Sequence, residues 1–258
     1  MRRFRVASFP PLFLCGAVFG WVGEGVVVDT LYGNATSPFP LSISFTGLAW
    51  QALLSVGVGW YMIGQALTEG RPTWTAMLSL AVGTSWGLWA VWWPAELGSK
   101  VDTSVWSFAH HALVCSIPLL FSWAVLGRAC PNWFAPGKVA TIVLWGLVVV
   151  IFLAARVPAR PYALLVLPPL LALCWAGLRR NARTEQRPDV LDVILGRIRP
   201  RNVMTLVLMP LAATAVYALF RSLNWRPATN VVLYVITMLL GFWYFVRSLW
   251  LLLRPKVG

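Results

Sequence analysis

Long apolar stretches alternate with short polar connections along this chain. A helix needs about 20 apolar residues to cross the hydrocarbon core of a bilayer, because each residue adds about 1.5 Å. The pattern therefore predicts an all-α, polytopic transmembrane bundle that forms one domain over residues 1–258. We expect about eight spans, at 9–28, 43–67, 74–94, 105–127, 139–155, 161–178, 203–221 and 229–252. The fifth and sixth are short, so either a tight hairpin or partly re-entrant segments fit them.

The composition favours a protein that lies in lipid rather than in water. Hydrophobic residues make up 59% of the 258 residues and charged residues only 11%, and the mean hydropathy is +0.73. A soluble domain carries about 25% charged residues. The 16 tryptophans are typical of membrane interfaces, where the ring lies among the headgroups and its N–H finds a partner.

The net charge of +13 predicts a topology rather than a nucleic-acid partner. With eight spans both termini share one side, and most of the 21 Lys and Arg residues then lie on that side. Positively charged connections face the cytoplasm, so we expect both termini there, in a bacterial inner membrane with anionic lipid as the partner. The polar connection at about 179–202 carries apolar residues at helical spacing over residues 189–198, which predicts a short amphipathic helix on the membrane surface. Docking of that helix on a protein partner is the alternative.

Polar side chains gather at the opposite, outer end of the predicted bundle. Glu24 and Asp29 end the first span, and the chain's two histidines, His110 and His111, open the fourth. The same interface is expected to receive Thr46, Gln51, Glu96, Asp102, Arg156, Arg160 and Tyr162. Ionisable groups are costly inside a membrane and mark functional sites by default, so the sequence predicts an outward-facing polar cavity.

These residues predict neither a cofactor nor a bound metal. Two adjacent histidines point about 100° apart on a helix, so both rarely bind one ion, and HExxH spacing is absent. The four cysteines are scattered, and three lie in apolar runs, where Cys behaves as a small hydrophobe. A hydrogen-bonded structural pair is the simplest alternative to a catalytic role for His110 and His111.

Two short segments carry a family resemblance. Residues 42–46 (SISFT) open the second span, and residues 108–121 (FAHHALVCSIPLLF) open the fourth. Over about residues 42–125 the chain resembles the androgen-inducible family of membrane threonine hydrolases and its bacterial relatives, whose members cleave lipid esters. The resemblance implies that Thr46 is the nucleophile and that His111, or His110, is its base. A hydroxyl needs such a base to become a nucleophile. Cys115, one turn after His111, is an alternative nucleophile.

Three other functions stay open. Glu24 and Asp29 are candidate general acids for an isoprenoid-like lipid held between tryptophans, because burial in an apolar site keeps carboxyl groups protonated. Intramembrane carboxylates and histidines also relay protons in transporters, although the sequence has no inverted repeat. A non-catalytic subunit of a larger membrane assembly needs little more than the tryptophan-rich faces.

Overall fold

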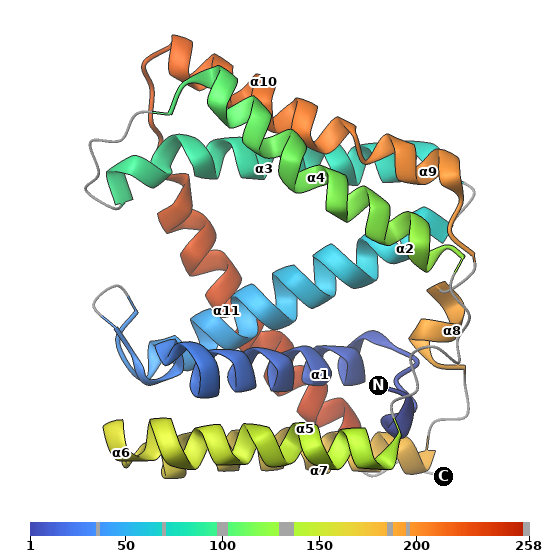
Figure 1. Ribbon diagram of the computed structural model, residues 1–258, viewed down its shortest axis with the longest axis vertical. Coiled ribbons are helices and arrows are strands. Elements are labelled where there is room, and N and C mark those ends of the chain that lie inside the picture. The colour runs from blue at the N-terminus through green and yellow to red at the C-terminus, as the bar shows by residue number, and fades with distance from the viewer. Residues whose placement is uncertain are drawn as a thin grey trace. The chain divides into compact units, whose positions relative to one another are not determined.

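The computed structural model describes residues 1–34, 37–68, 71–96, 103–128, 137–184, 188–194 and 197–254 (Figure 1). Every regular element in these ranges is a helix, which confirms the all-α prediction. Within the ranges described, seven helical segments are long and apolar enough to cross a membrane, so the chain is a multi-pass helical membrane protein. They are Phe9–Val28, Ile43–Thr68, Val105–Leu126, Lys138–Ala159, Ala163–Thr184, Pro200–Ser222 and Thr229–Leu253.

The third predicted span differs in composition from these seven. It forms α3 (Pro72–Glu96), a continuous helix of 25 residues, which is long enough to cross a bilayer. Its sequence is rich in serine, threonine, glycine and tryptophan, and it is not among the segments that meet the criterion of length and hydropathy. The count of eight spans therefore stays a prediction.

The chain divides into two compact units, each built from segments that are distant in sequence. Unit 1 contains residues 1–61, 131–193 and 234–258, and unit 2 contains residues 62–130 and 194–233. The expectation of a single domain over residues 1–258 stays a prediction.

Unit 1 is built on α1 (Phe9–Val22). Prolines stand at its start, where the first N–H groups of a helix have no intrahelical partner and the proline ring costs little. A single π-helical turn, η2 (Gly23–Val28), continues α1 and ends at Asp29, whose φ of 82° lies in the left-handed region. One side of α1 packs on α7 (Ala163–Thr184) (Figure 1).

A second contact of α1 is its crossing with η4 (Ile43–Met62), a long π-helix. A Cβ on Gly20 would lie only 2.6 Å from the carbonyl oxygen of Gly47, so the two backbones approach closely. Small residues permit this approach between helices in membranes. Trp21 is fully buried at the crossing, and its indole N–H donates a hydrogen bond of 2.9 Å to the Ile43 carbonyl.

The other elements of unit 1 surround this crossing. They are η1 (Arg2–Phe4), η3 (Thr30–Tyr32), α5 (Lys138–Ile151), η6 (Phe152–Arg156), α6 (Val157–Ala159) and the part of α11 (Thr229–Leu253) from residue 234 onward. α11 packs on η4 at Gly241, where a Cβ would lie 3.0 Å from the backbone of Leu48 and Ala49. α5 is exposed along its length, as expected of a helix that faces lipid.

Unit 2 is built on the pair α3 and α10 (Leu208–Ser222), which lie side by side (Figure 1). They pack at glycines of α3, and a Cβ on Gly87 would lie 2.5 Å from the carbonyl oxygen of Ala213. α4 (Val105–Leu126) covers α10, and the ring of its Phe108 stacks on Tyr217 with 4.3 Å between centroids. The short helices α2 (Ile63–Thr68) and α9 (Pro200–Thr205) complete the unit.

The connection expected to hold an amphipathic helix forms α8 (Val190–Ile194), a helix of five residues. Val190 and Ile194 are buried, and so is Ile198 after the following turn. Within unit 2, Ile194 approaches the backbone of α2 at Gly64. Ile198 approaches the turn after α4 at Gly127. These three apolar side chains therefore pack inside the protein.

Candidate functional site

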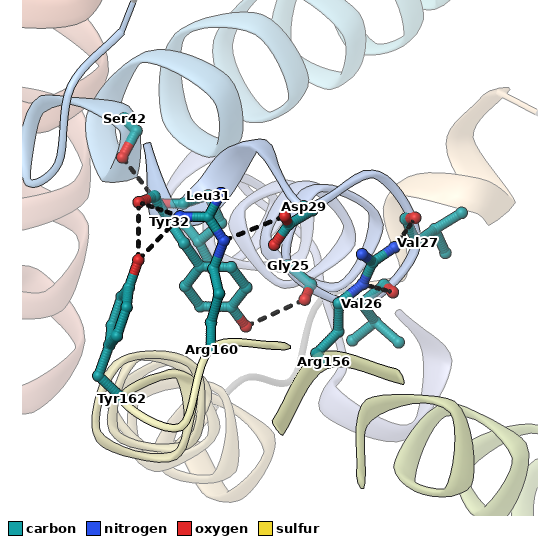
Figure 2. A network of polar contacts seen from close by, with 10 residues as sticks. All are labelled: Gly25, Val26, Val27, Asp29, Leu31, Tyr32, Ser42, Arg156, Arg160 and Tyr162. Carbon is teal, nitrogen blue, oxygen red and sulfur yellow. Dashed lines mark hydrogen bonds and ion pairs between the residues drawn. The ribbon is translucent and has the colours of Figure 1, made fainter. Parts of the chain in front are cut away.

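Unit 1 gathers polar residues around the end of the first span (Figure 2). They come from η2, from the start of η4 and from the turn between η6 and α7. The expected members present here are Glu24, Asp29, Gln51, Arg156, Arg160 and Tyr162.

Glu24 lies in the π-helical turn η2, inside the first membrane segment. Its Oε1 accepts a hydrogen bond of 3.1 Å from Nε2 of Gln51 in η4, and its Oε2 accepts one from the hydroxyl of Thr30. The side chain is partly exposed. Both of the partners found within the described ranges are neutral, so this carboxylate is oriented without being neutralised by a cation.

Asp29, the second carboxylate, is bound differently. Nε of Arg160 lies 3.1 Å from Oδ2 of Asp29 (Figure 2). The Arg160 side chain is 34% exposed and that of Asp29 is 26% exposed. A hydrogen bond of 3.0 Å from Arg160 to the hydroxyl of Tyr162 raises the pKa of the guanidinium, and Asp29 adds to this shift. The ion pair anchors the turn that ends the first span.

Tyr32 ties the same turn to both sides of the site. Its hydroxyl donates a hydrogen bond of 3.0 Å to the Gly25 carbonyl, and its own carbonyl accepts one of 3.2 Å from the hydroxyl of Tyr162 (Figure 2). The side chain is 2% exposed. Burial raises the pKa of Tyr32 to about 12, and the negative charge of Asp29 contributes to the rise. Tyr32 thus remains a hydrogen-bond donor at neutral pH.

Arg156 caps the first span. Its Nε donates a hydrogen bond of 2.6 Å to the Val26 carbonyl, and its Nη2 donates one to the Val27 carbonyl. The last carbonyls of a helix have no intrahelical donor and carry partial negative charge. A guanidinium supplies both the missing hydrogen-bond donors and a positive charge. Arg156 therefore holds the end of η2 against η6, and with it the turn that contains Glu24.

Thr46 lies in the same unit, directly before Gly47 at the crossing of η4 with α1. It is 7% exposed, and its hydroxyl donates a hydrogen bond of 2.9 Å to the carbonyl of Ser42 in the preceding turn. Back-bonding of this kind occupies the hydroxyl proton within the helix. Its role as a nucleophile stays a prediction.

His110 and His111 are exposed on α4 of unit 2. Nε2 of His111 lies 3.6 Å from Sγ of Cys115, one turn further along the helix. The predicted pair of Thr46 and His111 thus joins residues of different units, and it stays a prediction. Asp102 and the side chain of Glu96 lie outside the described residues.

Sequence reasoning missed three residues of this site. Thr30 donates a hydrogen bond to Glu24, and Tyr32 donates one to the Gly25 carbonyl. The Ser42 hydroxyl donates a hydrogen bond of 2.7 Å to the Leu31 carbonyl. Thr30 and Tyr32 belong to a short connection without a motif, whereas Ser42 opens the SISFT segment, where only Thr46 was expected to take part in a site. Most of the partners of these three residues are backbone groups, which carry no sequence signal.

The chain was compared with known protein families, curated proteins and solved structures. No protein-family model, curated protein or solved structure matches the chain.

Proposed function

We propose that this chain is an integral membrane enzyme in which the carboxyl group of Glu24 exchanges a proton with a lipid-like substrate. The observation that carries the proposal is the binding of Glu24 by Thr30 and Gln51 inside a membrane segment. A carboxyl group within a membrane segment is costly, and a functional role is its default interpretation. The donors that bind it within the described ranges are neutral, so they orient the carboxyl group for proton transfer without forming an ion pair with it.

The two carboxylates of the site have different roles in this proposal. Asp29 is held in an ion pair with Arg160, so it positions the turn and takes no part in proton transfer. Glu24 lies in a single π-helical turn, and such turns occur frequently at functional sites. A positioned general acid or base contributes about 10²–10⁴-fold to a reaction rate. Glu24 is thus the group whose loss should abolish turnover.

The proposal includes an orientation in the membrane. Asn181 near the end of α7 donates a hydrogen bond of 2.8 Å to the Phe4 carbonyl, and Arg180 donates one of 3.1 Å to the Arg254 carbonyl. The start of the first span and the end of the last lie at one end of unit 1, which supports an even number of crossings. Eight spans, α3 included, satisfy this condition. The positive charge at that end supports a cytoplasmic location in a bacterial inner membrane, with Glu24 near the outer leaflet.

The test is conversion of lipid by the purified full-length protein in liposomes made from a total bacterial lipid extract. Products are followed by liquid chromatography and mass spectrometry. We expect a lipid product with the wild type, and a rate at least about 100-fold lower with Glu24→Gln, which keeps the shape of the side chain. Asp29→Asn is the matched control at the neighbouring carboxylate, and it should retain more activity than Glu24→Gln.

Two results would overturn the proposal. One is the absence of any lipid conversion by folded protein, and the other is unchanged conversion by Glu24→Gln. Loss of conversion in Thr46→Ala and His111→Ala with full activity in Glu24→Gln would favour the threonine-hydrolase hypothesis instead.

A further inference from the structure

The end of unit 1 away from Glu24 gathers arginines against tryptophan rings. The guanidinium carbon of Arg3 lies 5.4 Å from the ring centroid of Trp175, and that of Arg254 lies 4.8 Å from the ring of Trp250. Trp175 lies on α7, and Arg180 of the same helix joins α7 to the second pair, because its Nη2 donates a hydrogen bond of 3.1 Å to the Arg254 carbonyl. Three segments that are distant in sequence thus contribute to one basic cluster.

Packing of the N-terminal segment on α7 fixes this arrangement. The ring of Phe4 meets Trp175 edge to face, with 5.1 Å between centroids, and Nδ2 of Asn181 donates hydrogen bonds to the carbonyls of Phe4 and Arg5. The cluster is therefore a built feature of unit 1, although its two tryptophans remain 43% and 60% exposed at Trp175 and Trp250.

The cluster carries positive charge that no described carboxylate neutralises. Arg3, Arg180 and Arg254 form no ion pair within the described ranges. Asp189, in the connection that follows α7, is only 8% exposed, and its Oδ1 accepts a hydrogen bond of 2.8 Å from the Leu191 amide. Arg179 and Arg183 add exposed charge at the end of α7.

α11 extends the cluster toward the interior of the membrane. Arg247 lies 5.0 Å from the ring centroid of Trp243, two turns before Arg254 and thus about 10 Å deeper along the helix axis. Long arginine side chains in a membrane segment reach toward the headgroups while their stems lie along apolar surface. Exposed apolar side chains of α11, among them Val246 and Leu239, continue the same helix toward the bilayer centre.

We propose that this basic cluster binds the phosphate headgroup of an anionic phospholipid. Guanidinium groups bind phosphate oxygens through paired, charge-assisted hydrogen bonds. Tryptophans are typical of the level between the lipid phosphate and the acyl chains. The exposed face of α11 lies alongside the acyl chains of the bound lipid. The site is independent of the proposed enzyme activity, because it lies at the other end of α1.

The experiment measures which lipid the full-length protein retains. Protein is exchanged from mixed micelles that contain equal amounts of phosphatidylglycerol and phosphatidylcholine, and bound lipid is counted by native mass spectrometry. We expect at least a tenfold preference of the wild type for phosphatidylglycerol. The triple variant Arg3→Gln, Arg180→Gln, Arg254→Gln should lose this preference, and Arg254→Gln alone, at an exposed position, should weaken it severalfold.

The control removes the same charge from unit 2, in the triple variant Arg71→Gln, Arg128→Gln, Arg201→Gln, and it should retain the preference. Equal loss in the control would show that net charge alone attracts the lipid, and it would overturn the site. Equal retention of phosphatidylcholine by the wild type would also overturn it, as would displacement of the lipid by inorganic phosphate, which would make free phosphate the ligand. Glu24→Gln should leave retention unchanged, so this result does not depend on the enzyme proposal.

Discussion

Replacing Gly47 with alanine tests the crossing of α1 and η4 on which the site is built. A Cβ at this position would overlap the indole of Trp21, whose Cγ would lie 3.1 Å away and whose Cδ1 and Nε1 would lie closer still. The ring has no room to retreat, because it is fully buried, donates to the Ile43 carbonyl at 2.9 Å and meets the ring of Phe245 at 5.1 Å.

The expected cost follows from these contacts. Forcing an extra methyl group into a packed interior costs about 1–3 kcal/mol. Displacing the indole would also lose its hydrogen bond, worth about 1 kcal/mol. Alanine is the better helix former by about 1 kcal/mol, which offsets part of the cost. The net prediction is a loss of about 1–3 kcal/mol in the free energy of unfolding.

The measurement is reversible unfolding in mixed micelles, followed by tryptophan fluorescence. Gly146→Ala is the matched control, because a Cβ on Gly146 of α5 meets no atom within 4 Å. That variant should be as stable as the wild type or slightly more stable. If Gly47→Ala proved equally stable, the close approach of α1 and η4 would be refuted.

Three further predictions concern the polar site. The pKa of Tyr32 is raised from 10 to about 12 in the folded protein, so its contribution to stability is full below about pH 10 and is lost as pH rises toward 12. Ultraviolet titration of the wild type against Tyr32→Phe measures the pKa of this side chain. A Tyr32 transition near pH 10 would contradict the prediction. Arg160→Met should lower the free energy of unfolding by about 1–2 kcal/mol, because Asp29 loses its partner, and Arg160→Lys should lower it by less. Equal stability of the wild type and both variants would argue against a structural ion pair. On the threonine-hydrolase hypothesis, a fluorophosphonate probe should label Thr46 in the wild type and neither Thr46→Ala nor His111→Ala; an unlabelled but folded wild type rejects that hypothesis.

The positions of the helices were largely predictable, because the length of an apolar stretch decides whether it can cross a bilayer. Seven of the eight predicted segments coincide with helices that meet this criterion. Composition makes α3 the exception, since its tryptophans and hydroxyl side chains lower its apolar character. The division into two units was not predictable, since it depends on packing between segments distant in the chain.

The site was predictable only in part. Topology alone places Glu24, Gln51 and Arg160 at one interface, and in unit 1 these residues do take part in one polar region. The π-helical form of η2 has no sequence signal, because local propensities do not distinguish it from an α-helical turn. Nor does the sequence show that Arg156 binds backbone carbonyls, since a carbonyl is present at every residue.

The capping of the first span by Arg156 also sets an order of events during synthesis. The carbonyls of Val26 and Val27 and their guanidinium partner are separated by about 130 residues along the chain. At about 5–20 residues per second, a ribosome needs on the order of 10 s to cover that distance. During this interval the nascent first helix lacks the donor that finally binds it, so water, lipid headgroups or the insertion machinery must solvate its end. The cap of the first span therefore waits for the hairpin that carries Arg156, however early α1 enters the membrane.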